Sequence, residues 1–461
     1  MAQTLSSGGR IGSAGLSQAA GKQAGLSWFG IIRLGAVQAS IGAIVMLASS
    51  LLNRVMVVEY SVAAAIPAAL VAWHYAVQLT RPLWGHHSDR SARRTPWIIG
   101  GMSLLVIGAL MAVNATIMMA SPSIFGALLA ISAFTLIGFG VGIAGTTLLA
   151  LLASRVSMER KPASAAITWI MMIAGIVIAA AVAGANLDPF SPQRLAIVCS
   201  FVALAAFSLM LLALYRLEET TEVVERPHSD EQAKSFPEVL REIWQEDQAR
   251  RFTYFVFLSM LAYSMQDLIM EPFAGFLFAM TPGESTTLSS IQHGGILIGM
   301  LVAGLGGSLF AHYYGSNLKI WIVLGCAGSA MMLAGLSMAA STGGAWPLTA
   351  NVFGLGFANG MFAVGAVSAM LGLASKGVAS GEGARMGVWG AAQAIAFGLG
   401  GLLGAVIVDQ LRSMTGEDVT AFQIVFAVEA LLFIGAALMA TTMQMPRKER
   451  QTGAVKEAVG A

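Results

Sequence analysis

Long apolar stretches recur along almost the whole chain, and they constrain its fold more than any other feature. A helix that crosses a bilayer needs about 20 consecutive apolar residues. Of the 461 residues, 56% are hydrophobic and 11% are charged, whereas soluble domains carry roughly 25% charged residues. A water-soluble core cannot bury so much apolar surface. The sequence therefore predicts an all-α integral membrane protein.

Counting apolar stretches gives twelve membrane spans, six on each side of one long hydrophilic segment. They are predicted at residues 34–55, 61–83, 96–118, 123–152, 163–185, 194–216, 253–279, 288–312, 318–340, 346–375, 386–410 and 421–444. The regions follow as an N-terminal tail (1–30), a six-helix bundle (31–216), a linker (217–251), a second six-helix bundle (252–444) and a C-terminal tail (445–461). The tail at 1–30 lacks the pattern of a cleavable signal peptide.

Basic residues predict the orientation of these spans, because cytoplasmic loops carry an excess of Lys and Arg. With twelve spans and both termini in the cytoplasm, only Arg54, Arg194 and Arg412 would face the outside. The basic residues expected on the cytoplasmic side include Arg10, Lys22, Arg33, Arg81, Arg90, Arg93, Arg94, Arg155, Arg160, Lys161, Lys319, Lys376 and Arg385. This asymmetry predicts a multi-pass membrane protein with both termini in the cytoplasm.

The two halves resemble each other in sequence. Leu-Ala-Ser-Arg ends the fourth span at residues 152–155, and Leu-Ala-Ser-Lys ends the tenth at 373–376. Trp169 in the fifth span has a counterpart in Trp389 of the eleventh, at nearly the same offset. A parallel repeat of six spans is typical of one large class of transporter folds.

A short polar loop between the second and third spans carries a motif. Its residues Gly85, Asp89, Arg90, Arg93 and Arg94 resemble the loop between helices 2 and 3 of the major facilitator superfamily. The resemblance implies twelve helices in two pseudo-symmetric bundles. It also implies that these five residues form a gating latch that holds the two halves in one conformation. The equivalent loop at 311–317 has lost its acidic residue and most of its arginines.

Polar residues inside the spans are candidate functional residues, since charges at bilayer depth are costly. In the fold implied above, the first and seventh spans face each other. We therefore expect Arg54 to pair with Asp267 or Glu271, either as a static clamp or in gating or ligand binding, and Pro272 to leave a nearby carbonyl without its donor. The expected central polar seam comprises Asn53, Arg54, Glu59, Gln266, Asp267 and Glu271.

Other polar residues within the spans receive separate interpretations. Glu429 is a lone acid that faces a polar cavity or is protonated, and Asp409 is expected to reach toward the head groups. His74 and His293 are candidate ligands for the magnesium of a chlorin, although hydrogen-bonded packing histidines are the commoner alternative. No arrangement of nucleophile, base or metal ligands that catalysis requires is evident in the sequence, so we expect a protein that is not an enzyme.

Three stretches resemble signatures of the PucC family. They are residues 52–59 (LNRVMVVE), 81–90 (RPLWGHHSDR) and 266–273 (QDLIMEPF). The resemblance implies a role in assembling the light-harvesting antenna in the photosynthetic membrane, or chromatophore, of a purple bacterium. It implies membrane lipid and antenna polypeptides as partners, together with bacteriochlorophyll as a bound or delivered pigment. Bacteriochlorophyll synthase or another pigment-supplying protein is a further implied partner.

Two alternatives to this interpretation stay open. The acids within the membrane favour a proton-coupled secondary transporter of a tetrapyrrole or another hydrophobic small molecule, whereas the altered loop at 311–317 counts against it. The second alternative is a scaffold protein that has no pigment site.

Overall fold

The protein is all-helical throughout the residues that its computed structural model describes. These are residues 26–81, 84, 88, 91, 93–121, 123–156, 161–218, 241, 244–309, 318–374 and 382–443. The first half contains α1 (Trp28–Met46), α2 (Leu52–Arg54), α3 (Ala65–Val77), α5 (Thr95–Met118), α6 (Ile124–Arg155), α7 (Lys161–Leu187) and α8 (Pro192–Leu214). The second contains α10 (Asp247–Phe278), α11 (Pro282–Leu309), α13 (Leu318–Thr342), α14 (Leu348–Ala374), α15 (Glu382–Thr415) and α16 (Asp418–Thr442).

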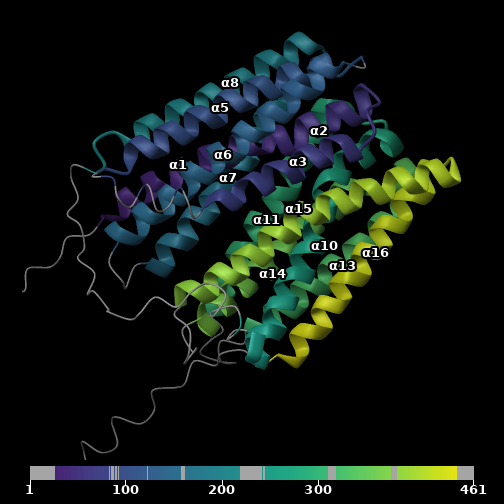
Figure 1. Ribbon diagram of the computed structural model, residues 1–461. Helices are drawn as coiled ribbons and strands as arrows, with labels where there is room; N and C mark the ends of the chain where they lie inside the picture. The colour runs from purple at the N-terminus through teal and green to yellow at the C-terminus, as the bar shows by residue number, and fades with distance from the viewer. Residues whose placement is uncertain are drawn as a thin grey trace, which may run out of the picture.

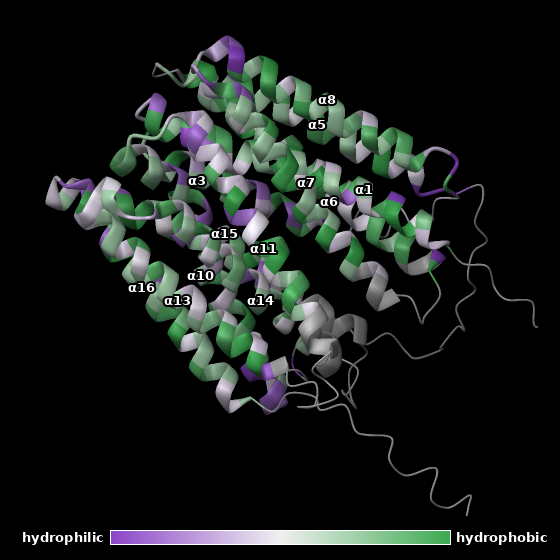
Figure 2. Cartoon of the chain, turned by 180° about the vertical axis from the view of Figure 1, so that it is seen from behind, coloured by the Kyte–Doolittle hydropathy of each residue, from purple (hydrophilic) through white to green (hydrophobic). Residues whose placement is uncertain are grey.

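Eleven helices of the described part are long and apolar enough to cross a membrane, which makes this a multi-pass membrane protein. The expected span at 61–83 is the exception, because α3 has only 13 residues and one short 3₁₀ turn (Gln78–Thr80) prolongs it. Residues 82 and 83, at the end of the expected span, lie outside the described residues. Figure 2 shows hydrophobic residues along most of each helix and hydrophilic residues gathered mainly toward the helix ends.

Two helices begin inside segments that the sequence analysis assigned to a tail and a linker. The first, α1, starts at Trp28 because the Ser27 hydroxyl caps it, accepting a hydrogen bond from the backbone N–H of Gly30 at 3.2 Å. The second, α10, starts at Asp247 rather than near 252, and Asp247 pairs with Arg250 one turn later. Local capping and charge pairs extend both helices beyond their apolar cores.

The buried apolar side chains form two large clusters that divide along the sequence. One cluster draws on residues 26–217 and the other on residues 252–443, while Leu268 and Ala405 of the second half join the first cluster. Figure 1 shows the purple-to-blue helices together on one side and the green-to-yellow helices on the other. Contact between the halves runs mainly along two helix pairs, α7 with α11 and α3 with α15.

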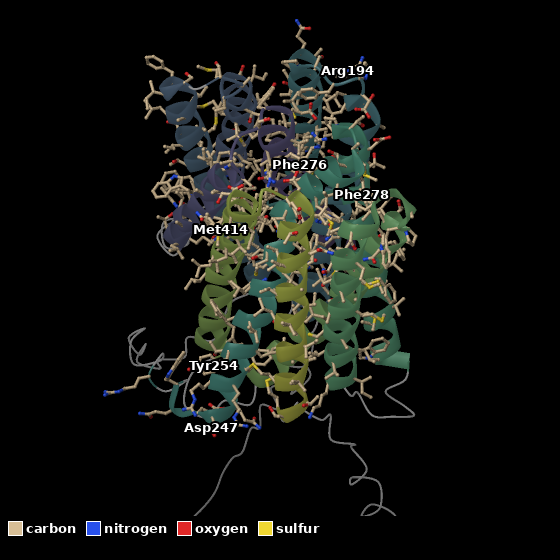
Figure 3. The ribbon with its side chains drawn as sticks, turned by 90° about the vertical axis from the view of Figure 1, so that its right-hand side faces the viewer. Arg194, Asp247, Tyr254, Phe276, Phe278 and Met414 are labelled. Atoms are coloured by element: carbon tan, nitrogen blue, oxygen red, sulfur yellow. The ribbon has the colours of Figure 1, made fainter. Side chains whose placement is uncertain are left out.

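The helices run between two ends of the molecule, and helix termini gather at each end. We call the end at which α1 begins and α16 ends the proximal end, and the opposite end the distal end. At the proximal end, the backbone N–H of Leu26 donates to the Arg155 carbonyl at 2.7 Å, and the Lys319 ammonium donates to the Met443 carbonyl at 3.3 Å. Figure 3 shows Asp247 near this end and Arg194 at the distal end.

Candidate functional site

The first span loses regular α-helical geometry as it approaches the distal end. Two π-helical segments, η1 (Leu47–Leu51) and η2 (Val55–Glu59), flank the three residues of α2. π-Helical turns widen the backbone and occur frequently at functional sites. Here they accompany two buried polar side chains, since Asn53 and Arg54 are each 1% exposed.

Asn53 supplies a hydrogen-bond donor to a backbone carbonyl of the opposite half. Pro272 lies inside α10 and has no N–H, so the Leu268 carbonyl four residues earlier has no helical donor. The Asn53 side-chain amide donates to that carbonyl at 2.8 Å. The expectation that Pro272 leaves a nearby carbonyl without its donor is therefore confirmed, and its partner comes from the other half of the chain.

Arg54 makes three contacts, and two of them join the two halves. Its Nε donates to the Ser285 hydroxyl at 3.0 Å, and Nη2 donates to the Met280 carbonyl at 2.6 Å. Its Nη1 pairs with the carboxylate of Glu59 at 2.5 Å. One guanidinium thus connects α2 to the end of α10 and to the first turn of α11.

The expected pairing of Arg54 with Asp267 or Glu271 is wrong, because the carboxylate that Arg54 binds is Glu59 on its own span. Glu271 is buried, although the charge of Arg54 acts on it, and hydroxyl groups from both halves occupy its oxygens. Ser50 donates to Oε1, and Thr286 donates to Oε2 at 3.5 Å. These contacts satisfy Glu271 without an ion pair.

Asp267 lies in a different environment, in the interior of α10. Its carboxylate is half-buried, and it has no hydrogen bond or ion pair with any residue that the structure describes. It lies close enough to interact electrostatically with Tyr75 of α3, with Tyr263 one turn earlier in α10 and with Glu429 of α16. An acid that has no partner at this depth is a candidate for contact with a ligand.

The two tyrosines that interact with this acid come from opposite halves and share an aromatic neighbour. The ring of Phe397, in α15, lies 5.9 Å from the ring of Tyr75 and 5.6 Å from that of Tyr263, centroid to centroid. Neither tyrosine hydroxyl has a hydrogen-bond partner among the described residues. We call Asp267, Tyr75, Tyr263 and Phe397 the seam cluster. It presents flat apolar faces, two hydroxyl groups and a carboxylate where the halves meet.

Two further polar side chains near the seam cluster are fully buried and have no partners. Gln266 and Glu429 are each 0% exposed, and neither the amide atoms of Gln266 nor the carboxyl oxygens of Glu429 have a hydrogen-bond partner in the described structure. Gln266 precedes Phe273 by seven residues, and Phe273 packs on Phe426 of α16 with ring centroids 4.9 Å apart. Both polar side chains therefore belong to the interface between α10 and α16.

The two candidate pigment ligands have similar local bonding. His74 is buried and its Nδ1 lies 2.6 Å from the Val71 carbonyl, while Nδ1 of the half-buried His293 lies 2.9 Å from the Ser289 carbonyl. A carbonyl can only accept, so Nδ1 carries the proton and Nε2 is the nitrogen left for a metal. In the described part of the chain, no three His, Cys, Asp or Glu side chains gather as a metal site.

Only part of the expected latch can be located. Gly85, Asp89 and Arg90 lie outside the described residues, whereas Arg93 is exposed. Arg94 Nη1 donates to the Ala150 carbonyl at 2.9 Å, which is a contact within the first half.

Arg94 also takes part in a carboxylate site at the proximal end. The backbone N–H groups of Arg94 and Thr95 donate to Glu218 at 2.9 and 2.8 Å. Burial raises the pKa of Glu218, but these bonds and the charge of Arg155 outweigh it and hold the pKa below its ordinary value.

Three members of the seam cluster, Tyr75, Tyr263 and Phe397, were not among the residues predicted from the sequence. Tyr263 lies four residues before Asp267, so helical spacing places the two on one face and could have identified it. Tyr75 and Phe397 carried no comparable signal, because their proximity depends on α3 packing against α15.

Comparisons with known proteins agree over most of the chain. The family model described as PUCC protein matches residues 51–448. The chain is 48% identical over 418 residues to the "Bacteriochlorophyll synthase 44.5 kDa chain" of Rhodobacter capsulatus, which covers 90% of this chain and 95% of that relative. It is 30% identical to "Protein PucC" of the same organism (90% and 92%) and 28% identical to "Protein PucC" of Cereibacter sphaeroides (87% and 88%).

Proposed function

The chain belongs to the PucC family, and on that premise we propose that it is a non-enzymatic membrane assembly factor for the light-harvesting antenna of a purple photosynthetic bacterium. In this function it binds antenna polypeptides, delivers bacteriochlorophyll to them, or does both. The family and the name of a relative that is 48% identical support a role linked to bacteriochlorophyll. Antenna polypeptides and a pigment-supplying enzyme such as bacteriochlorophyll synthase are the proposed partners.

The proposed framework is the twelve-helix arrangement of the major facilitator superfamily, with both termini in the cytoplasm of the inner membrane. In support, the helices form two clusters joined along α7–α11 and α3–α15. Arg33, Arg94 and Arg155 lie at the proximal end, which would then face the cytoplasm. Arg54, Arg194 and Arg412 lie toward the distal end.

The seam cluster is the proposed pigment contact. A tetrapyrrole is flat and apolar with a few polar groups at its edge, and aromatic side chains favour stacked or edge-to-face packing against such rings. The observation that carries this proposal is the half-buried carboxylate of Asp267 near Tyr75 and Tyr263, which has no partner in the part of the chain that the structure describes. Their hydroxyl groups can donate to carbonyl groups of the pigment. The free Nε2 of His293 is the alternative ligand.

Absorption spectroscopy tests the proposed site directly. Purified protein is mixed with bacteriochlorophyll in detergent, separated from free pigment, and compared with variants Tyr75→Leu, Tyr263→Leu and His293→Leu. Asp418→Asn, a distal acid that pairs with Arg412, is the matched control. We expect a stoichiometric pigment band that the two tyrosine variants lose and the control retains. Pigment retention by both tyrosine variants would refute the seam cluster as the contact.

Transport is a second candidate function. It is favoured by Glu429, which is fully buried, has no hydrogen-bond partner among the described residues and interacts electrostatically with Asp267. Buried acids that exchange protons are a recurrent device of membrane transporters. Uptake of a tetrapyrrole into vesicles that depends on a proton gradient, and that Glu429→Gln abolishes, would support it. Deleting the gene and recording which antenna band disappears tests the assembly function independently.

A further inference from the structure

The distal ends of the two halves are tied together by helix caps that cross between them. α3 begins after Ala64, an alanine that has no side chain able to cap a helix. The cap comes instead from α15, where the Asp409 carboxylate accepts a hydrogen bond from the backbone N–H of Ala65 at 2.7 Å. Asp409 was expected to reach toward the head groups, but it binds the opposite half.

Asp188 forms a second contact of this kind, in which the first half caps a helix of the second half. We call the Asp409 and Asp188 contacts the two joints. Asp188, directly after α7, accepts a hydrogen bond from the Thr281 hydroxyl at 2.6 Å and one from the backbone N–H of Gly283 at 3.3 Å. Thr281 and Glu284 also form a local capping box at the start of α11. Asp188 is therefore an additional, cross-half cap on a helix that already has its own.

The two joints are related by the internal repeat of the sequence. In that repeat the fifth span (α7) corresponds to the eleventh (α15), and the second (α3) corresponds to the eighth (α11). In each joint an aspartate at the distal part of one helix caps the first turn of its partner. A carboxylate at a helix N-terminus is favoured by both hydrogen bonding and the helix dipole.

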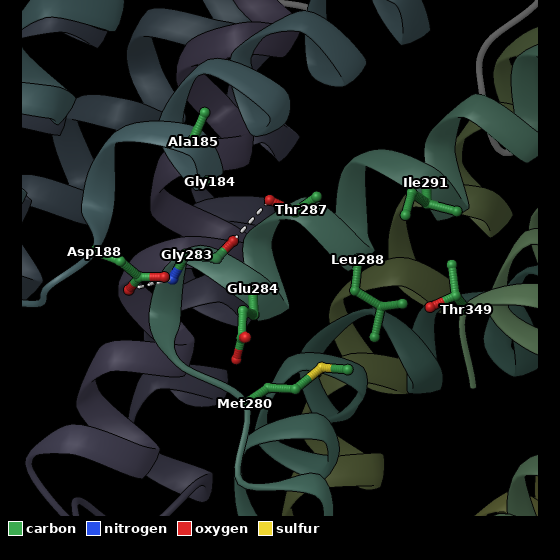
Figure 4. A pocket seen from close by; sticks show the side chains of 10 residues that line it. All are labelled: Gly184, Ala185, Asp188, Met280, Gly283, Glu284, Thr287, Leu288, Ile291 and Thr349. Carbon is green, nitrogen blue, oxygen red and sulfur yellow. Dashed lines mark hydrogen bonds between the residues drawn. The ribbon is translucent and has the colours of Figure 1, made fainter. Parts of the chain in front are cut away.

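Close backbone contact accompanies the Asp188 joint. A Cβ atom added to Gly184 would lie 2.3 Å from the Thr287 hydroxyl oxygen, and one added to Gly283 would lie 2.7 Å from the Gly184 carbonyl oxygen. Figure 4 shows Asp188, Gly184, Gly283 and Thr287 around this crossing, in the wall of a cavity of about 390 Å³. The joint is therefore tightly packed as well as hydrogen-bonded.

We propose that the Asp188 and Asp409 contacts hold the two halves together at the distal end, and that both contacts break when this end opens. In this role we call the two joints the closures. Each aspartate binds its partner through hydrogen bonds to a carboxylate, and neither forms an ion pair with any residue that the structure describes. The Arg54 contacts with Met280 and Ser285 lie on either side of Thr281 in the sequence, the residue that Asp188 binds, and stabilise the same closed state. Releasing both aspartates separates the distal ends of α7 from α11 and of α3 from α15.

Distance measurements between the two halves test this closure. Spin labels are placed at Ser121→Cys, in the turn between α5 and α6, and at Ser341→Cys, near the distal end of α13, because both positions are exposed. The native cysteines, both buried, are first replaced by alanine. Electron–electron double resonance is then recorded in lipid nanodiscs for the parent, Asp188→Asn, Asp409→Asn and the double variant. We expect a longer-distance population that is small in each single variant and dominant in the double variant.

Thiol labelling gives an independent second readout. Ser289→Cys, in α11, is a buried reporter beside Glu271 in the seam. We expect its maleimide reaction rate to rise several-fold in each single variant, and the increases to multiply to roughly tenfold or more in the double variant, as for independent sites. Asp418→Asn is the control, since Asp418 binds Arg412 within one half.

The outcomes separate this proposal from the proposed function, because neither readout involves pigment. Distance distributions and labelling rates that match the parent in both single variants and in the double variant would overturn the closure. Should the double variant not purify as a single species, the two single variants decide, because each alone is expected to shift both readouts. Equal effects of Asp418→Asn and the two closure variants would also overturn it.

Discussion

Replacing Asn53 by leucine should destabilise the protein because it leaves the Leu268 carbonyl buried without a donor. In the native protein, Pro272 removes the helical donor and the Asn53 amide replaces it at 2.8 Å. An unsatisfied buried carbonyl costs about 1–3 kcal/mol. Leucine is close in size to asparagine, so we expect a loss of about 2 kcal/mol in the free energy of unfolding, most of it from this one hydrogen bond.

The variant Pro272→Ala supplies the test that isolates this cause. Alanine restores the N–H at position 272, which can bond the Leu268 carbonyl within α10. In the Pro272→Ala background, Asn53→Leu should therefore cost less than about 1 kcal/mol, and the double-mutant cycle should give a coupling energy of about 1–2 kcal/mol. Side-chain packing alone predicts no coupling between these two positions.

Thermal unfolding of the detergent-purified protein, followed by intrinsic tryptophan fluorescence, provides the measurement. The four proteins of the cycle are compared in one detergent at one pH, and size-exclusion chromatography confirms that each is a single species. An equal loss from Asn53→Leu in both backgrounds would refute the reasoning. So would full stability of the single Asn53→Leu variant.

Four further predictions concern other parts of the molecule. Arg54→Met should lower the free energy of unfolding by roughly 3 kcal/mol, about 1 for each of its three hydrogen bonds. Arg412→Met breaks a more exposed ion pair, so it should cost under about 1 kcal/mol in the same unfolding assay. Gly184→Ala should lower the unfolding temperature, since its Cβ would lie 2.8 Å from a backbone nitrogen of α11. The pKa of Glu218 is lowered by folding, so its stabilisation is present above the ordinary pKa of 4.5 and is lost as pH falls through the lower folded pKa; Glu218→Gln should therefore destabilise at pH 7 and lose its effect in acid. Glu429→Leu should raise stability by about 1–3 kcal/mol, because it removes a buried polar group that has no hydrogen-bond partner among the described residues.

Sequence reasoning was most successful where one helix determines the outcome. Apolar length alone located eleven spans that the structure contains, and the missing N–H of Pro272 identified an unpaired carbonyl in α10. The partner of Arg54 could not be found in this way, because Glu59 reaches it across the π-helical turns of the first span. Apolar periodicity does not encode such widened turns.

Features that depend on packing between helices were beyond the sequence. The repeat paired Trp169 with Trp389, yet Trp389 is fully buried and donates to the Thr253 hydroxyl at 3.1 Å, whereas Trp169 is 39% exposed. The repeat fixes equivalent positions in the two halves but not their surroundings. Tyr75 was missed as a site residue for the same reason, because its neighbour Phe397 is more than 300 residues away in the sequence.

The polar side chains between the two halves fall into two sets. One set has hydrogen-bond partners in the opposite half, and the other has no partner among the described residues. This difference suggests a different role for each set. Toward the distal end, Asn53, Arg54, Asp188 and Asp409 all bind backbone or hydroxyl groups of the opposite half, which is the arrangement a closure requires. Asp267, deeper in the interior, has no partner in the described structure. An unpaired polar group at bilayer depth carries a cost that packing does not offset. A ligand that enters the seam while the distal end stays closed would offset that cost. The proposed pigment site would therefore be loaded from the proximal side or laterally from the bilayer.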